Sequence, residues 1–172
     1  THCTSSAASD VYKRQNILSA SAAEIGNHDQ AIIAYNKVIS LKPDHAEAYS
    51  NMSVSLQEQG KLNEAVEACK KAISLKFDHV VAYSNMGNAL QKQGKLDEAI
   101  EAYNQAISFK PDYADAYCNM GVILKEKGKI KEALEAYNKT ILINPNYTLA
   151  YNNIGTIFRN QGNPSEAIKA YN

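Results

Sequence analysis

The sequence lacks both an excess of charge and any long apolar run. Its 18 Lys and Arg residues balance 18 Asp and Glu residues, so there is no electrostatic reason to expect a nucleic-acid partner or an anionic membrane surface. No stretch of about 18 uninterrupted apolar residues occurs, and we expect no membrane insertion. The hydrophobic content of 45% indicates a folded chain rather than a disordered one.

Cysteine is scarce, and recognisable catalytic chemistry is missing. The three cysteines show neither paired nor metal-ligand spacing, so we interpret them as small apolar fillers in a reduced chain. A cytoplasmic location is favoured. The histidines are isolated, and no acid–base pair, nucleophile arrangement or phosphate-binding glycine loop can be assembled. The sequence therefore predicts a protein that is not an enzyme, with no catalytic residues, no cofactor and no metal.

The chain also lacks an initiator Met, and its first residues differ from the rest. Residues 5–15, Ser-Ser-Ala-Ala-Ser-Asp-Val-Tyr-Lys-Arg-Gln, resemble the in-frame translation of a transposase-based sequencing adapter. We therefore expect residues 1–15 to be a non-native segment, and the natural sequence to begin at Asn16, inside a repeat. The alternative is a short Ser- and Ala-rich leader that ends in a helix start.

Glycine and proline are few, but they recur at one spacing. Five glycines are 34 residues apart: Gly26, Gly60, Gly94, Gly128 and Gly162. The same step relates four tyrosines, Tyr49, Tyr83, Tyr117 and Tyr151, and three prolines, Pro43, Pro111 and Pro145. Such a period indicates stacked structural repeats. We expect one array over residues 16–172, with units at about 12–45, 46–79, 80–113, 114–147 and 148–172, the last of them truncated.

Each unit has the pattern of a helical hairpin. In the second unit, apolar and small residues recur at helical spacing from Tyr49 to Leu56 and again from Leu62 to Leu75. Gly60 ends the first helix, because glycine tolerates the positive φ of a C-terminal cap. No segment has the two-residue period of a strand. The sequence therefore predicts an all-α fold, a right-handed superhelical solenoid of stacked antiparallel helix hairpins.

Local signals refine the helix ends. Asp44 followed by Glu47 resembles a capping box at the start of a first helix. Pro164 stands at the favoured first position of a last helix. Phe77 occupies the place of a helix-ending proline, so we expect a tighter or longer junction there.

A unit with an aromatic residue, a large apolar residue, Gly or Ser, and then Gly, Ala and Pro resembles the tetratricopeptide repeat. The third unit carries this pattern most clearly: Tyr83, Met86, Gly87, Leu90, Gly94, Ala99, Tyr103, Ala106 and Pro111. Residues 82–88 and 115–120 are similar to the superhelical arrays that precede the catalytic region of O-GlcNAc transferases, and to many bacterial arrays. The resemblance implies a protein-binding module and is confined to the repeats.

The residue two places after each recurring tyrosine is an asparagine. Helical phase turns it about 200° from the tyrosine, so we expect these side chains to form a ladder along the inner, concave surface. An asparagine side chain both donates and accepts hydrogen bonds, as a peptide bond does. The predicted peptide-binding residues are Asn51, Asn85, Asn119 and Asn153, together with Asn88, Ser50 and Ser84. The alternative is that the asparagines serve local structure.

The sequence thus predicts a non-enzymatic protein–protein interaction scaffold that binds an extended peptide or protein segment in its concave groove. A second hypothesis is a substrate-recognition module of a larger enzyme, a glycosyltransferase or sulfotransferase, and a third is a spacer that binds nothing. In the truncated last unit, four apolar residues are expected to line an unfinished seam: Ile154, Phe158, Ile168 and Tyr171. We therefore expect fraying after about Asn163 and a tendency to self-associate there.

Overall fold

The structure is a computed structural model that describes residues 2–171, with side chains described for residue 11 and residues 13–170. Over these residues it contains ten α-helices and no strand, which confirms the all-α prediction. The helices are α1 (His2–Glu24), α2 (His28–Leu41), α3 (Ala46–Glu58), α4 (Leu62–Leu75), α5 (Val80–Lys92), α6 (Leu96–Phe109), α7 (Ala114–Glu126), α8 (Ile130–Ile143), α9 (Thr148–Asn160) and α10 (Pro164–Tyr171).

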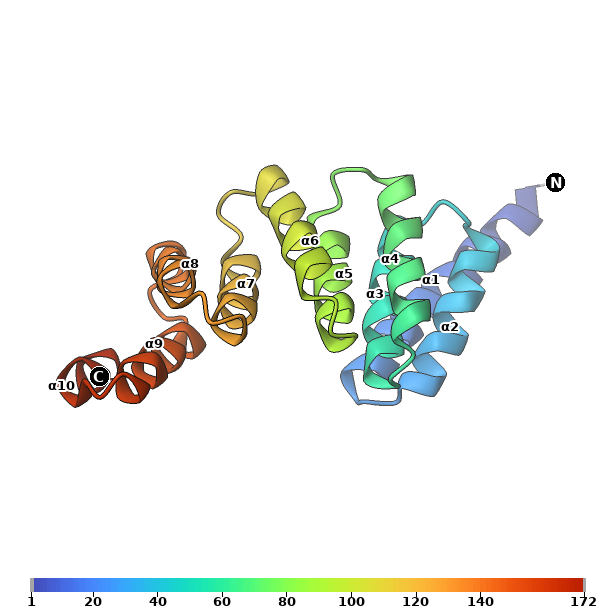
Figure 1. Ribbon diagram of the computed structural model, residues 1–172. Coiled ribbons are helices and arrows are strands. Elements are labelled where there is room, and N and C mark those ends of the chain that lie inside the picture. Colours follow the sequence, from blue (N-terminus) through green and yellow to red (C-terminus); the bar gives the residue numbers. More distant parts are fainter. Residues whose placement is uncertain (1, 172) are drawn as a thin grey trace. The chain divides into compact units, whose positions relative to one another are not determined.

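The chain divides into two compact units, residues 1–94 and 95–172, and each is described by itself. In unit 1, α1 pairs with α2 and α3 with α4, and α5 packs against α3 and α4 (Figure 1). In unit 2, α7 pairs with α8 and α9 with α10, and α6 packs against α7. The helices therefore form the stacked hairpins that the period predicts. The odd-numbered helices are called first helices and the even-numbered ones second helices.

The recurring glycines end the first helices as predicted. Gly60 has φ of 72°, a left-handed conformation that costs a residue with a side chain about 1–2 kcal/mol. Its N–H donates to the Gln57 carbonyl at 3.0 Å, and the Lys61 N–H donates to the Leu56 carbonyl at 2.9 Å. These bonds satisfy carbonyls that would otherwise be left open at the helix end. The other four recurring glycines have φ between 72° and 76°.

Two of the local predictions are wrong and one is confirmed. The N-cap of α3 is His45, with no side-chain cap hydrogen bond, so Asp44 lies one position too early for a capping box. The carboxylate of Glu47 instead lies 3.2 Å from His45 Nδ1. Phe77 does not lengthen its junction, because α4 ends at Leu75, the position equivalent to the end of α6 at Phe109. Pro164 is the first residue of α10, as predicted.

In two of the hairpins, a small residue on the first helix packs against a residue on the second helix. In unit 2, Tyr137 is fully buried among apolar side chains of α7, α8 and α9. A Cβ at Gly121 would lie only 2.7 Å from Tyr137 Cε1. In unit 1, the equivalent residues are Ser53 and Cys69, both fully buried. The smaller first-helix residue, Gly121, thus faces the larger Tyr137, and the larger first-helix residue, Ser53, faces the smaller Cys69.

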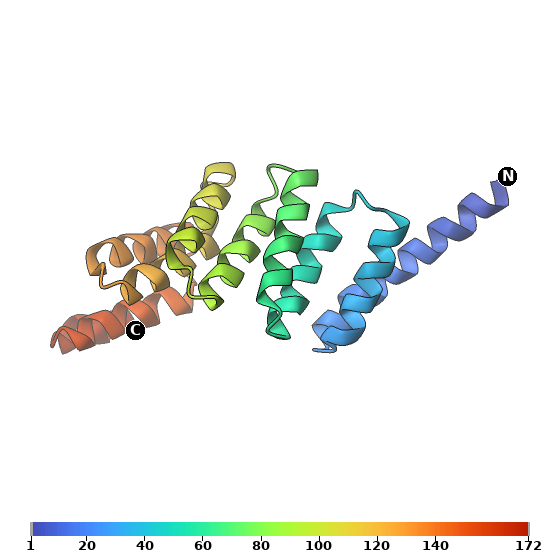
Figure 2. The same cartoon turned by 45° about the vertical axis from the view of Figure 1, so that its right-hand side comes forward.

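Helix α1 is 23 residues long, whereas the other first helices have 13 residues each. Its N-terminal part extends beyond the end of α2 (Figure 2). Thr1 lies outside the described residues, as do the side chains of residues 2–10 and 12. Val11, Lys13 and Arg14 are exposed, and the first buried side chain of α1 is Ser19 among those described. The described side chains of α1 that are buried therefore all follow residue 15.

We expect a chain that begins at Asn16 to melt within a few degrees of the full chain, because the removed side chains that are described make no buried contact. Thermal unfolding followed by circular dichroism measures this. A chain without residues 1–24 is the control, and it should lose much more stability because Ser19 and Ala22 are buried. A loss of more than about 2 kcal/mol on removing residues 1–15 would show that this segment belongs to the fold.

Candidate functional site

Within each unit, the first helices contact one another along one side. In unit 1, α3 contacts both α1 and α5, and in unit 2, α7 contacts α9. The exposed sides of α3 and α5 in unit 1, and of α7 and α9 in unit 2, are called the first-helix face. The helices that form this face carry all seven predicted peptide-binding residues.

In unit 1, one asparagine is available to a ligand and one is already engaged. Asn51 is exposed, and among the residues whose side chains are described, none forms a hydrogen bond with its side chain. Asn85 is half-buried, and its Nδ2 donates to the Ser50 carbonyl at 3.2 Å and to Ser50 Oγ at 3.3 Å. Gln57 Nε2 in turn donates to the Asn85 carbonyl at 3.1 Å. These three bonds tie α3 to α5.

The structure corrects the placement of Ser50 and Ser84. Their side chains are 0% and 3% exposed, so they do not line an open surface. Each precedes its asparagine by one residue, and one residue of helix is a rotation of about 100°. That rotation turns the serine into the packed interface of neighbouring helices, where a small side chain fits. Asn88 lies half-buried on α5.

In unit 2, both asparagines have partners within the chain. The side chain of Asn119 is hydrogen-bonded to the Tyr103 side chain. Asn153 Oδ1 accepts from Lys125 Nζ at 2.5 Å, and its Nδ2 donates to the Leu149 carbonyl at 2.9 Å. A peptide that used either asparagine would therefore have to replace an existing bond.

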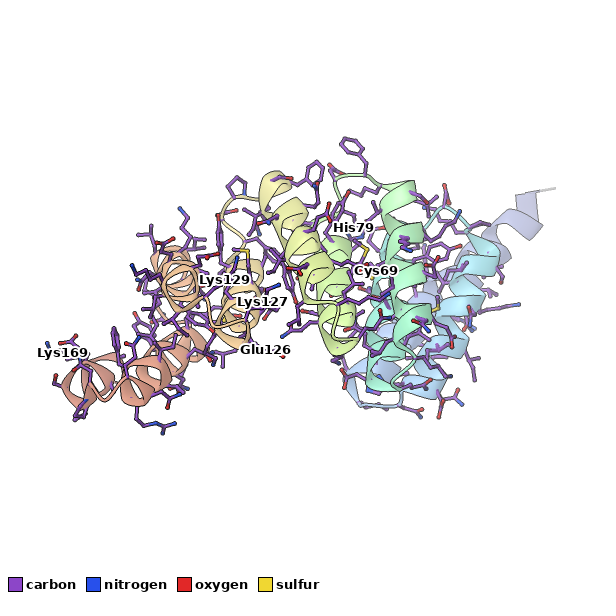
Figure 3. The ribbon with its side chains drawn as sticks, viewed as in Figure 1. Cys69, His79, Glu126, Lys127, Lys129 and Lys169 are labelled. Carbon is purple, nitrogen blue, oxygen red and sulfur yellow. The ribbon has the colours of Figure 1, made fainter. Side chains whose placement is uncertain are left out.

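Burial shifts the pKa values of several ionisable groups of the chain toward their neutral forms. The Tyr147 hydroxyl donates to Asp115 Oδ1 at 2.7 Å, and burial, with this carboxylate adding to it, raises the Tyr147 pKa. Burial raises the pKa of the Cys118 thiol to about 11, and that of the Cys69 thiol to about 11 (Figure 3). Burial lowers the pKa of His79. The thiols are therefore neutral at physiological pH and are poor nucleophiles.

Two kinds of feature are absent from the residues that the structure describes. No helix there combines the length and apolar character needed to cross a bilayer. No group of three His, Cys, Asp or Glu side chains among them is placed to hold a metal ion.

The predicted seam of the last unit is only partly open. Ile154 is buried and Phe158 is half-buried, whereas Ile168 on α10 is 60% exposed. The Tyr171 side chain lies outside those that the structure describes. We expect self-association at this end of the chain, with the exposed Ile168 as the described seam residue most accessible to a second copy.

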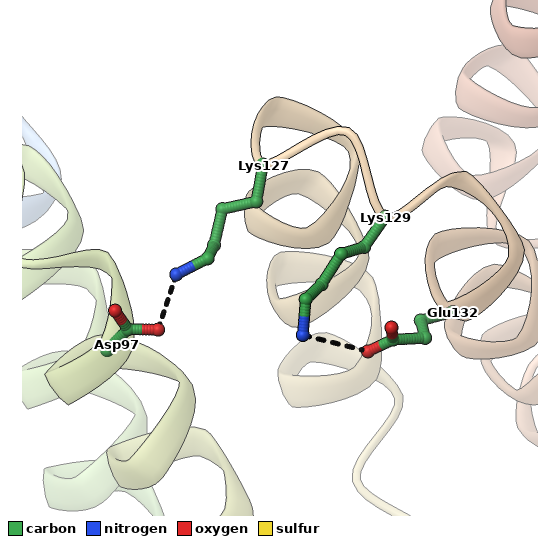
Figure 4. A network of polar contacts seen from close by, with 4 residues as sticks. All are labelled: Asp97, Lys127, Lys129 and Glu132. Atoms are coloured by element: carbon green, nitrogen blue, oxygen red, sulfur yellow. Dashed lines mark hydrogen bonds and ion pairs between the residues drawn. The ribbon is translucent and has the colours of Figure 1, made fainter.

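Sequence reasoning missed a set of polar tethers between successive hairpins. Each joins the end of a first helix to the start of the preceding second helix: Gln59 Nε2 to Asp29 Oδ1 at 2.6 Å, Gln93 Nε2 to Asn63 Oδ1 at 3.0 Å, and Lys127 Nζ to Asp97 Oδ1 at 2.5 Å. Figure 4 shows the last of these beside the Lys129–Glu132 pair. The three donor positions recur at the repeat period, and so do the three acceptor positions. This spacing is the sequence signal that could have revealed the tethers.

Replacing Lys127 with glutamine should keep a tether of the kind that Gln59 and Gln93 make, but should remove its pH dependence. The Lys127 ammonium holds the pKa of Asp97 below its usual value. A lowered folded-state pKa stabilises the fold above the unfolded-state pKa, and this contribution is lost as the pH falls through the folded-state value. The advantage of wild type over Lys127→Gln should therefore shrink below about pH 4.

Urea unfolding from neutral to acid pH measures this difference. Lys129→Gln is the matched control, because it removes an exposed pair within one helix end and such pairs contribute little. A constant difference between wild type and Lys127→Gln at all pH values would contradict the role of this ion pair.

Comparison with known proteins agrees with this architecture. Models of the tetratricopeptide repeat match residues 23–60, 55–94, 87–128, 114–147 and 136–169. No curated protein matches the chain by sequence.

Solved structures with the same fold cover most of the chain. A crystal structure of MamA is 32% identical with a TM-score of 0.76, and the match covers 90% of each chain. A second MamA crystal structure is 31% identical with a TM-score of 0.76, over 95% of this chain and 89% of that one. PilF of Pseudomonas aeruginosa has a TM-score of 0.83 over 96% of this chain and 77% of that one, but its 19% identity shows the fold alone. The chain therefore belongs to the tetratricopeptide repeat family, whose members are in general non-catalytic scaffolds for protein interaction.

Proposed function

We propose that this chain holds an extended peptide or protein segment in a concave groove, with the first-helix face of unit 1 as part of its lining. The observation that carries the proposal is the contrast between two equivalent asparagines. Asn85 donates its amide N–H to a backbone carbonyl, that of Ser50. Asn51 stands at the same repeat position, exposed, and among the described residues none bonds to its side chain. Asn51 is thus free to make the same bond to the backbone of a ligand.

Apolar side chains on the same face can add contact area. Val54 on α3 and Val81 on α5 are 42% and 44% exposed. Both are small enough to leave a ligand backbone within reach of the asparagines. We expect modest sequence preference, because a bond to a backbone carbonyl is available from every residue of a peptide.

A display selection with random peptides tests the proposal. The chain is the immobilised target, and selected peptides are then measured in solution against Asn51→Ala. Loss of one neutral hydrogen bond of about 0.5–1.5 kcal/mol should weaken binding about twofold to tenfold. Melting should be unchanged, since Asn51 has no partner to lose among the described side chains.

Asn138→Ala is the matched control, because Asn138 is exposed on the second helix α8. It should leave peptide binding unchanged. Peptides that bind Asn51→Ala as tightly as wild type would place their site elsewhere and overturn the proposal.

The alternative function, a substrate-recognition module of a glycosyltransferase or sulfotransferase, would use the same face. The resemblance to O-GlcNAc transferase arrays is its support. The MamA match covers 90% of that solved chain, so a relative of this kind consists of repeats over nearly all of its solved length. This favours the scaffold. Because 18 basic residues balance 18 acidic residues, we do not expect a nucleic-acid partner.

A further inference from the structure

Two pockets that are built alike lie on the opposite side of the hairpins, one in each unit. Pocket 1 in unit 1 has a volume of about 440 Å³ and lies among α2, α3 and α4. Pocket 2 in unit 2 has a volume of about 380 Å³ and lies among α6, α7 and α8. Both volumes are within the range of sites for small ligands.

The pockets exist because consecutive second helices stand apart. Neither α2 and α4 nor α6 and α8 have Cα atoms within 8 Å of each other, and all four helices are fully described. Side chains of the first helix form an apolar floor in the gap, Tyr49, Met52 and Leu56 in pocket 1, with Ile32 from α2 as a wall. Their counterparts two repeat periods later are Tyr117, Met120, Leu124 and Ile100.

The floor is not closed over by the chain itself. Ile32, Tyr49 and Met52 are only half-buried, and so are their counterparts in unit 2. The hydroxyls of Tyr49 and Tyr117 make no hydrogen bond with any residue whose side chain the structure describes. A flexible methionine beside a tyrosine with a free hydroxyl suits an adaptable site that takes a large apolar side chain.

The rims carry charges in a fixed order along the second helix. In pocket 1, Glu64 and Glu67 precede Lys71 on α4, and in pocket 2, Glu132 and Glu135 precede Lys139 on α8. Glu67 pairs with Lys70 and Glu132 with Lys129, both as exposed pairs three residues apart, which contribute little. Among the described residues, no ion-pair partner is found for Glu64 or Glu135.

We propose that each pocket binds a short peptide segment with a basic residue, a large apolar residue and an acidic residue in that spatial order. The apolar side chain would lie on the Tyr-Met-Leu floor, the basic group would meet the glutamates, and the acidic group would meet the lysine. Four to seven residues of helix separate the glutamates from the lysine, a rise of about 6–10 Å. The first and third residues of an extended tripeptide lie about 7 Å apart, so three residues span the rim. Both pockets would bind such a segment independently of the first-helix face.

The methionines allow a direct test, because the chain has three of them. Met52 lines pocket 1, Met120 lines pocket 2, and Met86 lines neither. The probe is the blocked tripeptide acetyl-Arg-Phe-Glu-amide, titrated to a few millimolar into the full chain with isotope-labelled methionine methyl groups. We expect the NMR signals of Met52 and Met120 to shift and saturate, with Met86 unmoved. Acetyl-Arg-Ser-Glu-amide should bind at least about tenfold more weakly, because it buries no aromatic ring.

Charge reversal assigns the two sites separately. Glu64→Lys should weaken the Met52 response about threefold to tenfold, and Glu135→Lys should do the same for Met120, the scale of one exposed charge pair. Glu126→Lys is the control, since Glu126 is also exposed and, among described residues, has no ion-pair partner. No shift of Met52 and Met120, equal shifts of all three methionines, or equal binding of the serine peptide would overturn the proposal.

Discussion

Replacing Gly121 with alanine should destabilise unit 2 by about 1–3 kcal/mol, the range for overpacking a dense core. Alanine in a helix interior is ordinarily about 1 kcal/mol better than glycine, so the expected sign is opposite to helix propensity. The added Cβ would lie 2.7 Å from Tyr137 Cε1 and 3.0 Å from Cδ1 and Cζ. The Tyr137 ring is fully buried, so it must shift within a packed core to make room. Urea unfolding of the full chain measures the change.

A double-mutant cycle identifies the clash as the cause. Tyr137→Cys alone should cost about 3–5 kcal/mol through the cavity that it leaves. With the ring gone, Gly121→Ala should cost nothing more, so the double variant should be more stable than the sum of the singles by over about 1 kcal/mol.

Gly128→Ala is the control for that cycle. It has φ of 74° and nothing within 4 Å of its added Cβ, so it should cost about 1–2 kcal/mol from backbone strain alone. Tyr137→Cys should not rescue it. A Gly121→Ala variant as stable as wild type would show that the Tyr137 ring moves aside at little energetic cost.

Replacing all four ladder asparagines with alanine should weaken binding of a selected peptide at least as much as Asn51→Ala alone, about twofold to tenfold, because only Asn51 lacks a partner among the described residues. The structure adds a second expected effect. Asn85, Asn119 and Asn153 have bonds within the chain, so the same variant should lose about 1–3 kcal/mol of stability. Binding and unfolding should be measured on one preparation, well below its melting temperature.

The single variants separate the two effects. Asn51→Ala should affect binding only, whereas Asn85→Ala should lower stability by about 1 kcal/mol because it removes the bond to the Ser50 carbonyl. Equal stability of the two single variants would show that the Asn85 bond is not a support of the fold.

The repeat period was sufficient to predict the helices of this chain. Gly60 and its equivalents set the end of each first helix, and the predicted end of α4 at Leu75 matches the structure. Phe77 shows why the missing proline had no effect. Lys76 adopts φ of −144° and ψ of 96°, close to the values of Lys110 before Pro111, so the packing of the next hairpin ends the helix without help from proline.

The candidate site was harder to predict, because helical phase gives a direction but not the rotation between neighbouring hairpins. Asn51 and Asn85 have the same phase, yet Asn51 is exposed and Asn85 bonds to the preceding first helix, α3. Ser50 was assigned to the surface for the same reason and is fully buried. The tethers at Gln59, Gln93 and Lys127 differ in residue type, so only their spacing connects them.

The central claim is that an extended segment lies along the first-helix face and bonds to Asn51. The most direct measurement is a crystal structure of the full chain with a peptide taken from the display selection. We expect the bound peptide to be extended, with its backbone within hydrogen-bond distance of the Asn51 side chain. A peptide seated among the second helices, or one that contacts no asparagine of the ladder, would contradict it.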